Sequence, residues 1–164
     1  MTKAFLLGVE ELEKEFGPDA AEKWMRGIGD QLAEIEGPGV MGEGEPDKLG
    51  YFTICLFAPK LNEFVESTGG IPKGHEKILR DVRGPHEGDK AEEVAAVNVC
   101  CDMCHAYRKK RALMAGKKNL LHLAAKSKLT GAKEINEAAM KKANVKASDV
   151  KKLLKEKDCI FKYV

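Results

Sequence analysis

The chain of 164 residues is predicted to have a predominantly helical α+β fold, with a small sheet packed by amphipathic helices. Residues 3–16 and 18–36 place apolar side chains three and four positions apart, which is typical of helices with one apolar face. Residues 51–59 (YFTICLFAP) and 158–164 (DCIFKYV) are rich in β-branched and aromatic side chains, which is typical of strands. The composition, 43% hydrophobic and 33% charged residues, is that of an ordinary folded protein.

The second helix is predicted to begin at Pro18 or Asp19 and to end before Gly37 and Pro38. Its expected apolar face consists of Ala21, Trp24, Ile28, Leu32 and Ile35. Two glycines lie inside it, Gly27 and Gly29, and each costs about 1 kcal/mol relative to alanine. A kink is the expected explanation, and the close approach of a neighbour or ligand is the alternative.

The remaining elements follow from local patterns and turn residues. Residues 37–50 are expected to form a loop before the strand at 51–59, and short helices are expected within 60–69 and at 75–82. The later expected elements are a long helix over 89–115, a basic helix containing Leu120, Leu121, Leu123 and Ala124, helices over 130–143 and 147–157, and the terminal strand.

Charge divides the chain unevenly. Residues 106–164 contain 17 Lys and Arg against 5 Asp and Glu, whereas residues 1–105 contain 11 against 21. We therefore distinguish an acidic helical and strand region with a cysteine cluster (1–116) from a basic helical region ending in a strand (117–164), within one compact domain. The asymmetry fits solvated lysine-rich helices, an acidic partner protein, nucleic acid, or packing between the two halves. A homodimer is a further possibility that the sequence leaves open.

The expected cellular compartment determines the expected redox state of the five cysteines. No apolar run approaches the roughly 18 residues of a membrane helix, and the N-terminus lacks the pattern of a signal peptide. These features predict a cytoplasmic protein without a membrane segment. The cysteines are then expected to be reduced thiols, ligands or nucleophiles, not structural disulfides.

The segment VNVCCDMCHAYRKKR (97–111) concentrates thiols and an imidazole. On a helix, residues four apart share a face, so Cys104 is paired with Cys100, and His105 with Cys101. Thiolates and imidazole suit zinc or an iron–sulfur cluster, although the thiols could simply pack as small apolar groups. The predicted metal ligands are Cys100, Cys101, Cys104, His105 and Cys159. Further candidates to complete the site are Cys55, His75, His86 and His122.

Two other chemistries share this segment. The letters CDMCH match the attachment motif of c-type haem, but haem attachment occurs outside the cytosol, which makes haem c the unfavoured cofactor. A redox Cys-x-x-Cys would need Cys101 at a helix N-terminus, with the cations of 108–111 helping to ionise the thiols. The helical pattern upstream predicts instead that Cys101 lies in mid-helix.

Three segments resemble landmarks of one group of proteins: FGPDAAEKWMRGIGDQLAEIEG (16–37), VCCDMCHAY (99–107) and KEKDCIFKYV (155–164). The chain is similar there to 4-vinyl-reductase-like small-molecule-binding domains and to aminothiazoline-carboxylate-hydrolase-like proteins. The resemblance implies a small hydrophobic or heterocyclic ligand, often with a cysteine near its pocket. It departs where the family has Gly-Asp before the last cysteine, since this chain has Lys157 and Asp158. It identifies no catalytic residue.

The basic region is predicted to contain a helix-turn-helix with a lysine-rich second helix. A nucleic-acid-binding protein would use residues 108–157, and the candidate phosphate contacts are Arg108, Lys109, Lys110, Arg111, Lys151 and Lys152. Only Ser148 offers a neutral polar side chain to bases, which favours nonspecific binding. The leading hypothesis is therefore an accessory or sensor protein that binds a metal or small ligand through the cysteine cluster. Nucleic-acid binding and thiol-redox chemistry are the alternatives, and the sequence does not decide whether the protein is an enzyme.

Overall fold

A computed structural model describes residues 2–42, 50–52, 94–95, 97, 100–127 and 131–164 of the chain. The elements in these residues are α1 (Thr2–Phe16), α2 (Pro18–Glu36), β1 (Gly50–Phe52), α5 (Cys100–Met114), β2 (Leu120–Lys126), β3 (Lys133–Ile135), α6 (Glu137–Lys142), α7 (Ala147–Leu153) and β4 (Cys159–Tyr163). The predicted class, a mainly helical α+β fold with a small sheet, is confirmed. In this part of the chain, no helix is long and apolar enough to cross a membrane.

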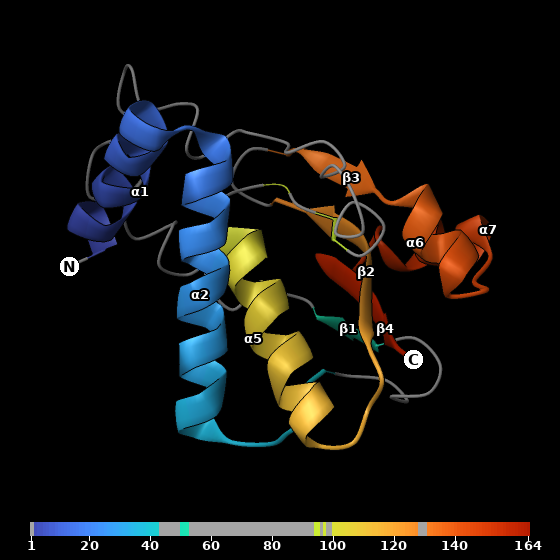
Figure 1. Cartoon of the computed structure of the whole chain (residues 1–164). Helices are drawn as coiled ribbons and strands as arrows, with labels where there is room; N and C mark the ends of the chain where they lie inside the picture. The colour runs from blue at the N-terminus through green and yellow to red at the C-terminus, as the bar shows by residue number, and fades with distance from the viewer. Residues whose placement is uncertain (1, 43–49, 53–93, 96, 98–99, 128–130) are drawn as a thin grey trace.

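The sheet is antiparallel, with the strand order β1-β4-β2-β3, and helices cover both of its faces. In Figure 1, α5 and α2 lie on one side of the sheet, and α6 and α7 lie on the other. The apolar core beneath α6 and α7 includes Leu121, Leu123, Ala124 and Ile160. On the opposite face, Leu120 and Phe161 pack with Ala112 of α5. Both faces of the two central strands are therefore buried.

The burial of both faces explains one wrong prediction. The segment containing Leu120, Leu121, Leu123 and Ala124 was expected to be a helix, but it forms strand β2. A central strand needs apolar side chains at nearly every position, and such a run cannot be distinguished from a buried helix by periodicity. The expected helix over 130–143 is likewise replaced by β3 and the shorter α6.

Other boundaries were predicted more closely. The first two helices and the terminal strand lie where they were expected, and α7 is a shorter form of the helix predicted over 147–157. The strand at 51–59 is described only where β1 includes its first residues, and the short helices at 60–69 and 75–82 lie outside the described residues. Val94, Ala95 and Val97 are not helical, so the helix predicted over 89–115 begins too early.

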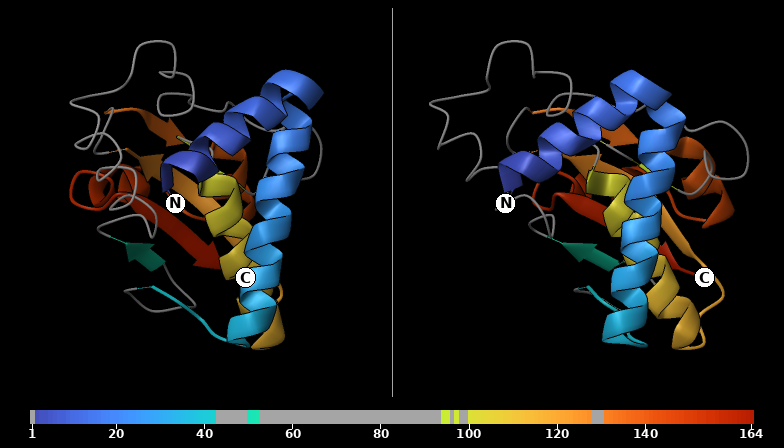
Figure 2. Two further views of the ribbon diagram at one scale, coloured as in Figure 1. Left: turned by 90° about the vertical axis from the view of Figure 1, so that its left-hand side faces the viewer. Right: turned by 60° about the vertical axis from the view of Figure 1, so that its left-hand side comes forward.

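Helix α2 packs against α5 with a different face from the predicted one. Its buried residues occur every fourth position: Ala21, Met25, Gly29 and Ala33. Trp24, Leu32 and Ile35, which were assigned to the apolar face, are 40%, 36% and 81% exposed. Small side chains let the two backbones approach closely, which bulky ones at this crossing would prevent. Figure 2 shows the two helices side by side in both orientations.

Gly29 is the point of closest approach. A Cβ atom there would overlap the carbonyl oxygen of Met103 and would lie 3.1 Å from the Cβ of Ala106. At Gly27, by contrast, an added Cβ would meet nothing within 4 Å. Close approach of a neighbour, not the expected kink, therefore explains Gly29, while packing does not explain Gly27.

This difference gives a matched pair of variants. We expect Gly29→Ala to lower the free energy of unfolding by about 1–3 kcal/mol, because overpacking must push α2 away from α5. Gly27→Ala should raise it by about 0.5–1 kcal/mol, since alanine is the better helix former and no neighbour obstructs it. Urea denaturation measures both. Equal effects of the two substitutions would contradict the close packing at Gly29.

Candidate functional site

The cysteine segment is buried because α5 lies between α2 and the sheet. Ten of its fifteen residues are buried, including the polar side chains Asp102, His105 and Arg108. Cys100, Cys101 and Cys104 are buried and form no disulfide within the described residues, and the same holds for Cys159 on β4. The first turn of α5 thus carries cysteines that the sequence had placed in mid-helix.

Cys159 and His122 form the central contact of the candidate site. The Sγ atom of Cys159 lies 2.8 Å from Nε2 of His122, and both residues are 6% exposed. They come from the neighbouring strands β4 and β2, whose register shifts between His122 and Ala124. Such a bulge changes which side chains point to a given face. Here it lets both His122 and Ala125 face α5, although they are three positions apart.

Arg108 of α5 contacts the same sulfur atom. Its Nη1 lies 3.5 Å from the Sγ of Cys159, and its guanidinium carbon lies 5.4 Å from the centre of the Phe161 ring. The side chain is only 3% exposed, so its charge acts in a region of low dielectric constant. A cation at this distance from a thiol favours the charged thiolate over the neutral form.

Two buried imidazoles lie next to each other in this site. The rings of His105 and His122 are nearly parallel, with an interplanar angle of 11° and centroids 6.3 Å apart. Burial, followed by the charge of Arg108, lowers the pKa of His122 to about 3. Burial also lowers the pKa of His105 well below its ordinary value, helped by His122, Arg26, Lys109 and Arg108. Both rings are therefore neutral at physiological pH.

His105 has a second unusual property. Both of its ring nitrogens are buried, and neither has a hydrogen-bond partner among the described residues. A buried polar group without a partner indicates an ion or water that completes its contacts, or a functional strain. A neutral imidazole is also the form that binds metals.

The predicted metal ligands do not all meet. Cys101 belongs to a separate apolar cluster with Val94, Val97 and Ala125, and its sulfur accepts a hydrogen bond from the Val97 amide at 3.5 Å. Cys159, in contrast, reaches α5 through Arg108. Within the described ranges, no group of three or more His, Cys, Asp or Glu is arranged to hold a metal ion.

Sequence reasoning named His122 only as one of several possible partners and treated Arg108 as a phosphate contact. Arg108 is instead buried beside Cys159. One signal for this position was present: Arg108 lies four residues after Cys104, one helical turn along the buried stripe. Of the other predicted phosphate contacts, Lys151 and Lys152 are exposed on α7.

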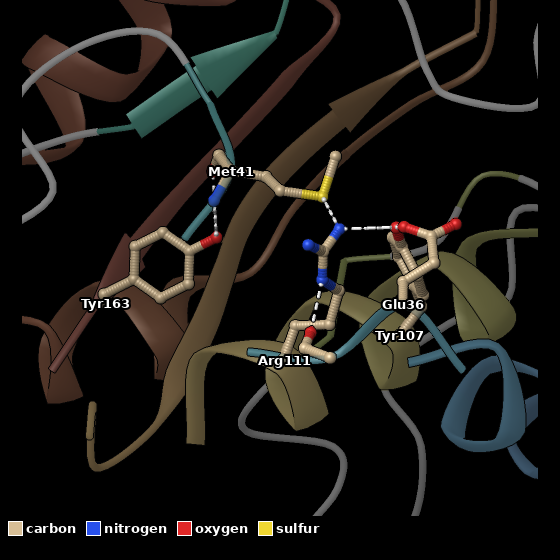
Figure 3. A network of polar contacts seen from close by, with 6 residues as sticks. Glu36, Met41, Tyr107, Arg111 and Tyr163 are labelled. Carbon is tan, nitrogen blue, oxygen red and sulfur yellow. Dashed lines mark hydrogen bonds and ion pairs between the residues drawn. The ribbon is translucent and has the colours of Figure 1, made fainter. Parts of the chain in front are cut away.

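A network of hydrogen bonds surrounds Arg111 near the C-terminal end of α5 (Figure 3). The guanidinium donates to Glu36 at 2.9 Å and to the hydroxyl of Tyr107 at 2.8 Å, and Tyr107 in turn donates to Glu36. The Tyr163 hydroxyl donates to the carbonyl of Met41 at 2.8 Å. The segment after α2 is thereby fixed against α5 and β4. It brings Gly42 so close to Phe161 that a Cβ atom would overlap the ring.

The neutral histidines predict a dependence of stability on pH. Between pH 6.5 and about 3, the unfolded chain binds a proton at His122 that the folded chain excludes, so stability falls as pH is lowered through this range. From pH 7 to 5 the loss should be about 2 kcal/mol for each such imidazole. Urea midpoints at the two pH values test this. His122→Gln should reduce the loss of stability between pH 7 and 5 by the share of one imidazole. An unchanged loss in this variant would contradict the low pKa of His122.

Comparison with known proteins leaves the site to be interpreted from its own chemistry. No family model, curated protein or solved structure matches the chain. The resemblance to 4-vinyl-reductase-like domains therefore stays a prediction. What the chain can do must be argued from Cys159, His122, Arg108 and His105.

Proposed function

We propose that the protein is a thiol-dependent small-molecule-binding protein in which Cys159, as a thiolate, is the group that meets the ligand. One observation carries this proposal: the sulfur of Cys159 lies 2.8 Å from Nε2 of His122 and 3.5 Å from the guanidinium of Arg108. A cation and a hydrogen-bond donor next to the sulfur both favour the charged thiolate, which is the reactive form of cysteine.

The two neighbours have different roles in this proposal. Burial together with Arg108 keeps His122 neutral, so the imidazole does not hold the thiol proton; its role is to donate a hydrogen bond from Nε2 to the sulfur. The cation of Arg108 then stabilises the negative sulfur, which is the nucleophilic form of cysteine. At about 4 Å and an effective dielectric constant near 20, a pair of opposite charges is worth about 4 kcal/mol. Arg108 is therefore expected to have the larger effect on the thiolate population.

The surroundings of Cys159 favour an apolar ligand with an electrophilic centre. Phe161 and Tyr163 lie on the same strand and the same face of the sheet, with their rings 5.5 Å apart in an edge-to-face arrangement. Aromatic walls with a few polar groups are typical of small-molecule sites. A small hydrophobic or heterocyclic ligand, the class that the family resemblance implies, would suit this environment.

A titration of the thiolate tests the proposal directly. The far-ultraviolet absorbance of the protein, minus that of Cys159→Ser, reports the charge on this sulfur without requiring access by a reagent. We expect a midpoint clearly below 8.5, the ordinary value for cysteine. Arg108→Gln should raise the midpoint by at least about one pH unit, because the stabilising cation is lost.

The controls separate this effect from a general loss of structure. Arg108→Lys keeps the charge and should restore most of the shift. Arg111→Gln removes a guanidinium from the same helix, but that group contacts Glu36 and Gly37, not Cys159, and should leave the midpoint unchanged. A midpoint near 8.5 in the native protein would refute the proposal.

The unpartnered nitrogens of His105 favour a second candidate, the binding of zinc by His122 and Cys159 with His105 as a third donor. His105 would have to move toward the other two, because the three side chains are not arranged to hold a metal ion in the described structure. Both imidazoles are neutral and buried, which suits metal binding. The Arg108 cation near the sulfur opposes a metal dication at the same atom, so we place this candidate second. An iron–sulfur cluster would require more thiolates than meet at Cys159 in the described structure.

Substitution of His105 distinguishes the two candidates. If zinc binds, cobalt substitution should give a sulfur-to-cobalt charge-transfer band, and His105→Gln should weaken zinc binding by at least about tenfold. The same variant should leave the thiolate midpoint nearly unchanged if only the thiol proposal holds. Equal zinc affinity in the native protein and in His105→Gln would eliminate the metal candidate.

A further inference from the structure

A groove of about 550 Å³ lies between α2 and α5, on the side of α5 that faces away from the sheet. Four cations line it, Lys23 and Arg26 from α2 and Lys109 and Lys110 from α5, against the single carboxylate of Asp30. Small-molecule sites commonly have volumes of about 300–1,000 Å³. The groove is thus large enough for a small ligand, and its cations favour a ligand with negative charge.

The floor of the groove is open because Gly27 lacks a side chain. An added Cβ at Gly27 would meet nothing within 4 Å, and the other small floor residue is Ala106 of α5. A glycine inside a helix costs about 1 kcal/mol relative to alanine. Neighbouring Gly29 is explained by the approach of Met103, whereas no group from the described residues occupies the space at Gly27. A ligand can therefore reach the helix backbone there.

Two of the groove cations pair with carboxylates that do not line the groove. Lys110 pairs with Glu34 at 3.0 Å, and the Nε of Arg26 pairs with Glu22 at 2.8 Å. The Nη2 of Arg26 is buried and has no hydrogen-bond partner in the described part of the chain. That nitrogen is shielded from solvent, but Arg26 itself lines the groove, and a guanidinium is suited to bind the oxygens of an anion.

We propose that this groove binds a small polyanion, a molecule with phosphate or multiple carboxylate groups. Arg26, Lys23 and Lys109 would supply the positive charge, and the space at Gly27 would hold the body of the ligand. The groove and Cys159 lie on opposite sides of α5, so this site does not rest on the function proposed for the thiol.

Calorimetric titration at constant ionic strength tests the site, with inorganic pyrophosphate and citrate as probes on protein treated with a chelator. Saturable binding of either probe at one site per chain is expected. Pyrophosphate alone would indicate phosphate recognition, and binding of both would indicate recognition of charge. The double variant Lys23→Gln/Lys109→Gln should weaken binding by at least about tenfold.

Two variants make the test specific to the groove. Gly27→Leu fills the open floor with a good helix former and should abolish binding without lowering the urea midpoint. Lys151→Gln/Lys152→Gln removes the same amount of charge from exposed positions on α7 and should leave the affinity unchanged. The absence of saturable binding, or an equal loss in the α7 variant, would overturn the proposal.

Discussion

The close packing of α2 on α5 at Gly29 is the constraint on which the rest of the structure depends. Because the two backbones approach within side-chain distance, α2 covers the outer side of α5 while the sheet covers the inner side. The part of the helix from Cys100 to Arg108 therefore has little contact with water, although it carries Asp102, His105 and Arg108. Burial of such groups is costly unless they meet partners or functional ligands, which places the unusual chemistry of the chain on this helix.

The consequences are electrostatic as much as steric. Burial is the largest cause of the low pKa of both His105 and His122. The same low dielectric constant strengthens the effect of Arg108 on the sulfur of Cys159. At the surface, a guanidinium 3.5 Å from a thiol would be screened by water and salt. The packing of two helices far from the sulfur thus determines how strongly its charge state is biased.

The sequence predicted the fold class and several elements, but little of the site. The periodicity of α1 and α2 and the composition of β4 are local signals, and these elements were found correctly. Strand β2 was missed because burial on both faces removes the alternation that identifies strands. The pairing of His122 with Cys159 depends on a register between residues 37 positions apart and on a bulge, and neither can be read from local pattern. The cysteine motif itself drew attention to Cys101, which packs in an apolar cluster elsewhere.

Only the width of α5 separates the two proposed sites, so charges in one site act on groups in the other. His105 faces the thiol site, yet Arg26 and Lys109 of the groove contribute to its lowered pKa together with Arg108. An anion held by those two groove cations would offset their effect and raise the pKa of His105. By thermodynamic reciprocity, a proton on His105 would favour the anion in the groove by the same free energy. Arg108 points to the other side, toward Cys159, so its influence on the thiolate is maintained whether or not the groove is occupied.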